Sequence, residues 1–509
     1  MPNPLYDALF APHEGSPSVF LEMPDGSAFT YAAFLGQAAQ FAHALKAAGL
    51  EPGDRVAVQI AKSPQALAVY AACVQTGIIF LPLNTAYTAT EVAYFVTDSG
   101  AKIVLCDESL AEGLTPVAQA TGARLETLNG NGTGSFVDLS LTHPTQFETT
   151  PRDADDLAAF LYTSGTTGRS KGAMLTQTNL LSNAQTLKDV WHFTSNDVLL
   201  HALPIFHTHG LFVGTNIMLL TGGRMLFLPR FDVDQVIALM PRATSVMGVP
   251  TFYTRLLADA RFNSDLTARM RLFISGSAPM LSETHHAFAD RTDHTILERY
   301  GMTETNMNTS NPYEGERRIG SVGFPLPDVD MKITDPETGA PLPQGETGMI
   351  EVRGPNVFKG YWQMPEKTAQ ELRPDGFFIT GDLGRVDDDG YVYIVGRGKD
   401  LIISGGYNVY PKEVEQVLDA QPGVLESAVI GVPHPDFGEG VVGVLVAHDD
   451  ATLDLDAILA SAASDLAKYK CPRRLFVLPE LPRNAMGKVQ KNALREAYAL
   501  AFMESVGDS

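Results

Sequence analysis

The stretch DRVAVQIAKSPQALAVYAACVQTGIIFLPLN, residues 54–84, predicts a strand, a helix and a second strand. Its two ends, DRVAVQI and IIFLPLN, are short and nearly continuous apolar runs, which are typical of strands buried on both faces. The part between them, residues 64–77, has apolar residues at helical spacing and ends at a glycine. This βαβ unit predicts an α/β fold in which helices cover both faces of a parallel sheet.

Other apolar runs extend this pattern along the chain. AKIVLCD (101–107) fits the same sheet, while SVMGVP (245–250) and RLFISGSAP (271–279) resemble buried strands that end in Gly- or Pro-rich loops. Ligand sites of α/β proteins tend to lie in such loops.

The second part of the chain has a different texture. From Asp328 onward, short strands alternate with frequent turns, which indicates a β-rich layer, and a compact α+β stretch follows YVYIVGRGKD. We therefore predict a large N-terminal body of stacked α/β sheets plus the β-rich layer, residues 1–398. A small, mobile C-terminal α+β domain, residues 399–509, would complete the chain.

Composition restricts the class of protein. The 509 residues are 45% hydrophobic and carry a formal net charge of -22. The acidic charge argues against nucleic-acid partners, because proteins bind nucleic acid mainly through clustered Lys and Arg. No apolar run approaches the ~20 residues of a membrane helix, and MPNPLYDALFAPHEGS lacks the features of a targeting peptide. Cys73, Cys106 and Cys471 have no metal-ligand spacing. We expect a cytoplasmic protein that binds neither membrane nor nucleic acid.

One loop stands out in this acidic chain. YTSGTTGRSKG (162–172) combines glycines, Ser and Thr hydroxyls and two cations, and contains no acid. Glycines allow a backbone to approach a ligand closely, and hydroxyls, N–H groups and a lysine together suit a polyphosphate. The spacing is not that of a P-loop, because Gly172 follows Lys171. A flexible surface loop is the alternative interpretation.

Further motifs follow this loop in order: FHTHG (206–210), YGMTET (300–305), TGD (380–382), GRGKDLIISGGYNVYPKEVE (396–415) and PRNAMGK (482–488). The set resembles the adenylate-forming acyl-CoA synthetases over essentially the whole chain, and within that superfamily it most resembles the malonyl-CoA synthetases. The resemblance implies that a carboxylate attacks the α-phosphate of ATP, releasing pyrophosphate, and that the thiol of coenzyme A then displaces AMP. ATP, coenzyme A and Mg²⁺ are the implied co-substrates and cofactor.

The resemblance assigns the ATP site to several motifs. Glu304 would bind Mg²⁺, and Thr303 would contact the α-phosphate. The loop would hold the β- and γ-phosphates, Tyr300 and Gly301 would flank adenine, and Asp382 and Arg397 would hold the ribose. The implied ATP-binding set is Thr163, Ser164, Gly165, Thr166, Thr167, Gly168, Lys171, Tyr300, Gly301, Asp382 and Arg397. A core role for Tyr300 and a turn role for Asp382 remain alternatives.

Four C-terminal residues receive roles from the same resemblance. Lys488 would neutralise the attacking carboxylate and the α-phosphate together, and its acylation by a lysine acetyltransferase, reversed by a deacetylase, would erase that charge. A solvated lysine is the alternative. Lys399 matches the hinge about which the C-terminal domain rotates between the two steps, and Gly405 and Gly406 would line the tunnel for coenzyme A.

The acyl pocket decides which acid is used. Arg255 would pair with a second carboxylate, because burying an unpaired carboxylate is costly and a bidentate arginine compensates. An outward-facing Arg255 is the alternative, and Arg317 and Arg318 are rivals for the role. His207 would orient the substrate carboxylate or gate the tunnel, unless it is a core histidine. The predicted acyl pocket contains His207, Thr208, Arg255, Ser277 and Met307.

These assignments predict a malonate:CoA ligase, with methylmalonate as a second candidate acid. The alternatives are a ligase for another small, aryl or medium-chain acid, and an adenylation enzyme that loads a carrier protein. A non-catalytic nucleotide-binding protein is disfavoured, because Lys171, Glu304, Asp382 and Lys488 are all present.

Overall fold

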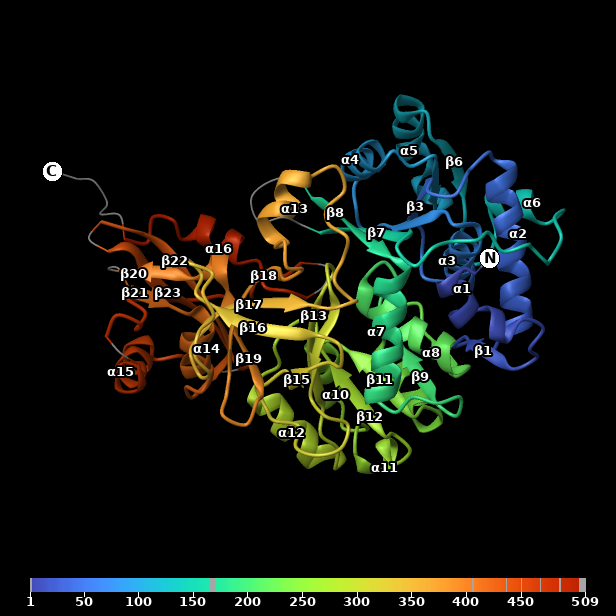
Figure 1. The fold of residues 1–509 in the computed structure, drawn as a ribbon. Helices are drawn as coiled ribbons and strands as arrows, with labels where there is room; N and C mark the ends of the chain where they lie inside the picture. Colours follow the sequence, from blue (N-terminus) through green and yellow to red (C-terminus); the bar gives the residue numbers. More distant parts are fainter. Residues whose placement is uncertain are drawn as a thin grey trace. The chain divides into compact units, whose positions relative to one another are not determined.

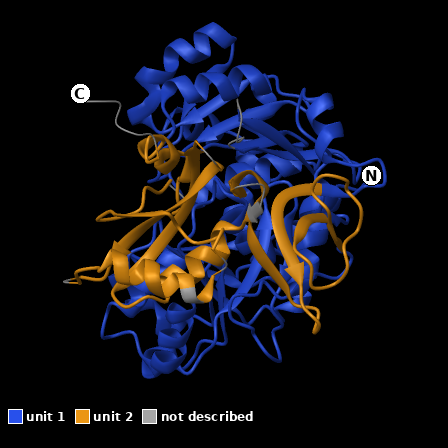
Figure 2. Cartoon of the chain, turned by 90° about the vertical axis from the view of Figure 1, so that its left-hand side faces the viewer, with its two compact units in different colours: residues 1–330, 352–378 blue, residues 331–351, 379–509 orange. Residues whose placement is uncertain are grey.

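The computed structural model describes residues 2–163, 170–404, 407–435, 437–449, 451–466, 468–484 and 487–502. The chain forms two compact units (Figure 2). Unit 1 contains residues 1–330 and 352–378, and unit 2 contains residues 331–351 and 379–509. Both units combine sheets and helices (Figure 1), which confirms the predicted α/β class. No helix in the described part of the chain is long and apolar enough to cross a membrane.

The βαβ stretch of residues 54–84 lies at the centre of a six-stranded sheet in unit 1. The strands in sheet order are β6 (Arg124–Thr127), β5 (Ile103–Cys106), β3 (Arg55–Gln59), β4 (Ile79–Pro82), β7 (Leu157–Thr163) and β8 (Lys171–Thr176). All neighbours are parallel except β7 and β8. Val56 of β3 faces Phe80 of β4 and Ile103 of β5 in the register. The predicted strands and their sheet are therefore confirmed.

Helices cover both faces of this sheet. Helices α4 (Ala89–Ser99) and α5 (Glu108–Thr121) share a hydrophobic core with β3, β4 and β5. Helix α3 (Pro64–Thr76) is buried along its whole length and packs against α2 (Tyr31–Ala47), as a helix that is apolar all round requires. Ser63 caps the start of α3, where its hydroxyl accepts from the Ala66 N–H, and Gly77 caps the end with φ 72°, a conformation that favours glycine.

A nine-stranded sheet forms the rest of the unit 1 core. Its order is β15 (Phe324–Pro325), β14 (Asn306–Ser310), β13 (Leu297–Met302), β12 (Leu272–Ser275), β11 (Ser245–Gly248), β9 (Val198–His201), β10 (Arg224–Phe227), β1 (Val19–Glu22) and β2 (Ala28–Thr30). The strands from β1 to β13 in this order are parallel, whereas β2, β14 and β15 pair antiparallel. Helices α9 (Val233–Leu239), α10 (Pro250–Leu257) and α12 (Ser282–Thr292) pack on it through a shared apolar core.

Unit 1 has further helices besides those that cover the two sheets. They are α1 (Pro4–Leu9), η1 (Ala11–His13), α6 (Ser135–Ser140), α7 (Gln177–Val190), η2 (His209–Thr215), α8 (Asn216–Thr221), η3 (Met240–Arg242), α11 (Ser264–Thr267) and α13 (Pro365–Glu371). The segment η2 is a π-helix, a rare form that is often found at functional sites.

Unit 2 contains two sheets. One has the order β16 (Asp330–Thr334), β17 (Gly348–Arg353), β18 (Phe378–Val386) and β19 (Val392–Arg397), and the other runs β21 (Tyr407–Val409), β20 (Ile402–Ser404), β23 (Gly438–Ala447) and β22 (Val424–His434), with β24 (Arg474–Val477) beside β23. Its helices are η4 (Gly398–Asp400), α14 (Pro411–Asp419), α15 (Leu455–Asp465) and α16 (Lys491–Ala497). Unit 2 thus takes in strands that precede Lys399, and the functional hinge at Lys399 stays a prediction.

Candidate active site

The YGMTET motif forms the end of β13 and the turn into β14. Tyr300 and Gly301 belong to β13, and Thr303 and Glu304 lie in the turn. The two strands approach so closely at Gly301 that a Cβ there would lie 1.9 Å from the Asn306 carbonyl oxygen. Glycine is therefore required by the strand pair, and the turn holds the buried Glu304 at a fixed place at the end of the sheet.

Around Glu304 lies a polar network within unit 1. The Thr163 hydroxyl lies 3.4 Å and the Tyr361 hydroxyl 3.0 Å from Glu304 Oε1. Tyr361 also contacts Glu371 Oε2 at 2.6 Å, and Lys171 Nζ pairs with the same carboxylate at 3.3 Å. Burial and the two carboxylates raise the pKa of Tyr361 far above its ordinary value. The lysine predicted to bind phosphate and the acid predicted to bind the metal ion thus belong to one network.

The FHTHG motif leads into the π-helix η2, and the buried His201, paired with the partly buried Lys62, fixes this segment. Lys62 Nζ lies 2.8 Å from His201 Nδ1, and His201 Nε2 lies 2.8 Å from the Gly210 carbonyl oxygen. A backbone carbonyl can only accept, so His201 donates from Nε2 and its Nδ1 accepts from Lys62. Burial and Lys62 hold the pKa of His201 well below its usual range, which keeps the ring neutral. The segment after Gly210 is thereby held in place.

Four predicted acyl-site residues come together at this segment. The Thr208 hydroxyl donates to Asn306 Oδ1 at 2.6 Å. Met307, which follows Asn306 in the chain, is buried. Ser277 has φ 71° in the loop after β12, and its hydroxyl lies 3.4 Å from His209 Nδ1. The partly buried His207 lies directly before Thr208, and its Nδ1 accepts from the His209 N–H at 3.3 Å.

A buried arginine that was not predicted lies at the same place. Arg299 of β13 is 4% exposed, and its guanidinium carbon lies 2.4 Å from where a Cβ on Gly276 would be. No carboxylate of the described residues pairs with it, and its Nε and Nη2 atoms have no hydrogen-bond partner. Burial lowers the pKa of Arg299 to about 9, so the group still carries its charge at neutral pH. An unpaired buried cation calls for an anionic ligand.

The arginines predicted for the second carboxylate lie elsewhere. Arg255 is exposed in the last turn of α10. Arg317 donates to the carbonyl oxygens of Pro312, Thr295 and Tyr313. Arg318 forms an ion pair with Glu316 at 3.0 Å.

The two residues assigned to the ribose face each other in unit 2. Asp382 of β18 and Arg397 of β19 are register partners, and Arg397 Nε lies 2.7 Å from Asp382 Oδ1. The Asp382 side chain is 4% exposed and that of Arg397 is 40% exposed. The carboxylate is therefore held firmly, while the guanidinium retains access to solvent.

Other predicted residues are placed in unit 2 or cannot be described. Lys488 is exposed, and its N–H donates to Asn484 Oδ1 at 3.0 Å. Lys399 lies in the turn η4, directly after β19. Ser164, Gly165, Thr166, Thr167 and Gly168 of the phosphate loop, and Gly405 and Gly406 of the predicted coenzyme A tunnel, lie outside the described residues.

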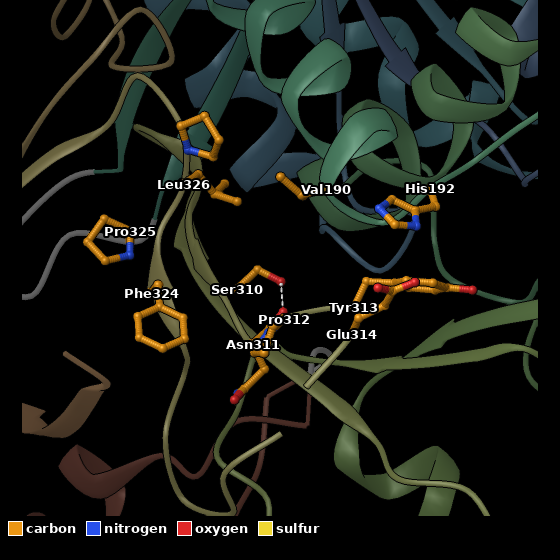
Figure 3. A pocket seen from close by; sticks show the side chains of 11 residues that line it. Val190, His192, Ser310, Asn311, Pro312, Tyr313, Glu314, Phe324, Pro325 and Leu326 are labelled. Atoms are coloured by element: carbon orange, nitrogen blue, oxygen red, sulfur yellow. Dashed lines mark hydrogen bonds between the residues drawn. The ribbon is translucent and has the colours of Figure 1, made fainter. Parts of the chain in front are cut away.

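A cavity of about 350 Å³ lies along β14 and β15 (Figure 3). Among its lining residues, His192 and Tyr313 have rings tilted by 46° with centroids 4.5 Å apart, and the Ser310 hydroxyl donates to the Asn311 carbonyl at 2.7 Å. None of the residues that line it belongs to the predicted site. The candidate site is thus defined by the network around Glu304 and the cluster at Arg299.

Comparison with known proteins agrees with this geometry. The sequence matches the AMP-binding enzyme family over residues 11–362 and the AMP-binding enzyme C-terminal domain over residues 413–488. The chain belongs to the AMP-binding enzyme family. This membership confirms the superfamily that the motifs predicted.

Individual relatives of this AMP-binding enzyme are similar over nearly its whole length. The crystal structure of ATP-bound MatB from Rhodopseudomonas palustris has a TM-score of 0.96 and 56% identity, covering 99% of this chain and 100% of that chain. A feruloyl-CoA synthase of Amycolatopsis is 38% identical, covering 93% of this chain and 94% of the relative. A malonate–CoA ligase of Arabidopsis thaliana is 36% identical, covering 83% of this chain and 74% of the relative. The predicted resemblance to malonate ligases is confirmed.

Two residues of this AMP-binding enzyme were missed by sequence reasoning. Arg299 directly precedes the YGMTET motif and lies inside the strand LERYGM (297–302). Because arginine is rarely buried without a partner, an arginine inside this strand could have indicated an anionic ligand. Tyr361 had no such signal, since only the fold brings it to Lys171 and Glu304.

Proposed function

We propose that the chain ligates malonate to coenzyme A through a malonyl-adenylate, consuming ATP and releasing AMP and pyrophosphate. Membership of the AMP-binding enzyme family and similarity to CoA ligases support the reaction class. Methylmalonate differs by one methyl group, which a pocket discriminates by only about 1–3 kcal/mol, so we propose it as a second substrate.

The buried Arg299 is the observation that favours a dicarboxylate as the substrate. Its guanidinium is fully enclosed and has no carboxylate partner among the described residues. A pocket for a purely apolar acyl chain would gain nothing from such a group, whereas a second carboxylate would satisfy it through a bidentate contact. The neighbouring Ser277 hydroxyl, Thr208 and Met307 would then bound the short central carbon of the substrate.

The first step requires that two anions approach each other. We propose that Lys488 neutralises the attacking carboxylate and the α-phosphate, and that His207 orients that carboxylate. Thr303 would contact the α-phosphate, and Asp382 would accept hydrogen bonds from the ribose hydroxyls while Arg397 supports it. Catalysis then rests on positioning and charge, without a covalent enzyme intermediate.

The residues present fit a magnesium ion. Glu304 supplies one carboxylate, and no group of three or more metal-binding side chains occurs among the described residues. Mg²⁺ binds through few protein carboxylates and completes its shell with phosphate oxygens and water. When bound, the ion would neutralise charge on the ATP phosphates that Lys171 would also contact.

The second step involves the C-terminal residues. We propose that Gly405 and Gly406 line the coenzyme A tunnel, with Lys399 as the hinge between the two steps. We further propose that acetylation of the exposed Lys488 switches adenylation off, and that the enzyme acts in the cytoplasm without membrane or nucleic-acid partners.

The test is AMP formation with ATP, Mg²⁺ and coenzyme A across acetate, malonate, methylmalonate, succinate, benzoate and octanoate. Wild type, Arg299→Met and Arg255→Met are compared in parallel. We expect malonate to lead with wild type, and Arg299→Met to remove that lead. If Arg255→Met removes it instead, the originally predicted arginine reads the second carboxylate. A monocarboxylate that leads with wild type would refute malonate as the substrate while leaving the reaction class intact.

A further inference from the structure

Tyr361 is a buried tyrosine between β17 and α13 whose backbone is fixed against β8. Gly360 O accepts from Met174 N–H at 3.0 Å, and Trp362 N–H donates to Gly172 O at 2.8 Å. The strand β8 begins at Lys171. Tyr361 is thus held at a constant distance from the strand that carries the phosphate-binding lysine.

The ring of Tyr361 and its hydroxyl contact different groups. Lys171 Nζ lies 4.0 Å from the ring centroid, a cation–π contact. The hydroxyl lies 3.0 Å from Glu304 Oε1 and 2.6 Å from Glu371 Oε2. One side chain therefore contacts both the lysine proposed for phosphate and the acid proposed for Mg²⁺.

We propose that Tyr361 is a positioning residue for MgATP, whose ring orients Lys171 and whose hydroxyl orients the carboxylate of Glu304. This inference rests on the proposed function, because it takes Lys171 and Glu304 as the phosphate and metal groups. Hydrogen bonds to a ligating carboxylate from such a second residue commonly set metal affinity.

The carboxylates of Glu304 and Glu371 both lie within hydrogen-bonding distance of the Tyr361 hydroxyl. A phenol has one hydrogen and donates one strong hydrogen bond, yet two carboxylate oxygens lie within reach. Glu371 is the alternative acceptor, itself paired with Lys171 and with Lys367 at 2.8 Å. Because the two lysines already satisfy Glu371, the hydrogen of the phenol can serve Glu304. A carboxylate has about four lone-pair sites, so Glu304 can accept from the phenol and still bind an ion.

The test separates the ring from the hydroxyl by calorimetric titration of ATP, without acid or coenzyme A, over a series of Mg²⁺ concentrations. Tyr361→Phe keeps the ring, and we expect it to raise the half-saturating Mg²⁺ concentration about 10- to 100-fold while ATP affinity without Mg²⁺ is unchanged. Tyr361→Leu removes both the ring and the hydroxyl, and we expect it also to weaken ATP binding without Mg²⁺ by a factor of about 2 to 30. Tyr361→Met replaces the leucine variant if that protein does not fold.

Three controls make the outcomes distinct. Tyr6→Phe removes another hydroxyl–carboxylate contact of unit 1, to Glu14 at 2.9 Å, and is expected to change neither constant. Lys171→Ala and Glu304→Gln test the site itself: if both leave ATP affinity and the Mg²⁺ requirement unchanged, the proposed function has failed at this site. If they act while Tyr361→Phe leaves the Mg²⁺ requirement at the wild-type value, or Tyr361→Leu matches Tyr361→Phe, the positioning role is refuted.

Discussion

Replacing Arg299 by methionine should stabilise the free enzyme and at the same time destroy its use of a dicarboxylate. The guanidinium is 4% exposed, and its Nε and Nη2 atoms have no partner, so folding removes a charge from water without compensation. Exchange of buried ionic groups for apolar residues of similar volume is often stabilising by about 1–4 kcal/mol. A methionine has flexible, apolar bulk that adapts to the space beside Gly276.

The same change should be costly for malonate. Its second carboxylate would enter the pocket without a partner, and breaking a buried charge pair in this way costs about 3–5 kcal/mol. At 1.36 kcal/mol for each factor of ten, kcat/KM for malonate should fall about 160- to 5,000-fold. A monocarboxylate of similar length, such as butyrate, has no second charge and should lose nothing.

The assay combines thermal unfolding of the free enzyme with AMP formation for malonate and butyrate. Arg255→Met is the matched control, because Arg255 is exposed and surface substitutions usually change stability by no more than about 0.5 kcal/mol. A lower Tm for Arg299→Met, together with an equal loss for both acids, would show that Arg299 stabilises the fold and does not read the substrate. Unchanged malonate kinetics with a raised Tm would refute the second-carboxylate contact alone.

Two further predictions address the same reaction. Gly276→Ala would place a Cβ 2.4 Å from the Arg299 guanidinium and displace that group. If the displacement costs more than about 1.4 kcal/mol of malonate binding, KM for malonate rises at least about tenfold. Gly26→Ser lies at an open turn with nothing within 4 Å and should leave that KM unchanged; equal KM values for the two variants would contradict the contact. Lys488→Ala should lower malonate-dependent pyrophosphate release by about 100-fold or more, because two repelling anions lose their shared cation. Thioester formation from synthetic malonyl-adenylate should stay near the wild-type rate. An equal loss in both half-reactions would contradict a role specific to adenylation.

Much of the fold was predictable because local pattern and global structure agree. Residues 54–84 form β3, α3 and β4 as expected, since short apolar runs suit buried strands and a capped apolar helix between them suits a parallel crossover. The extended loop motifs likewise identified the family without any coordinates. The π-helix η2 had no signal in the sequence pattern; in the structure, the Gly210 carbonyl at its start lies 2.8 Å from His201 Nε2 at the end of β9.

The sequence by itself determined the reaction class, since the motifs predicted to bind phosphate, metal and adenylate are short and contiguous, and their order along the chain is visible without tertiary information. Only the tertiary structure decided which arginine is buried: Arg255 and Arg299 are indistinguishable as residue types, but α10 presents Arg255 to solvent while β13 directs Arg299 against Gly276. Tyr361 shows the same limit, because its contacts join Lys171, Glu304 and Glu371 from distant parts of the chain. Burial and long-range pairing are properties of the packed fold, and a one-dimensional pattern does not contain the distances that create them.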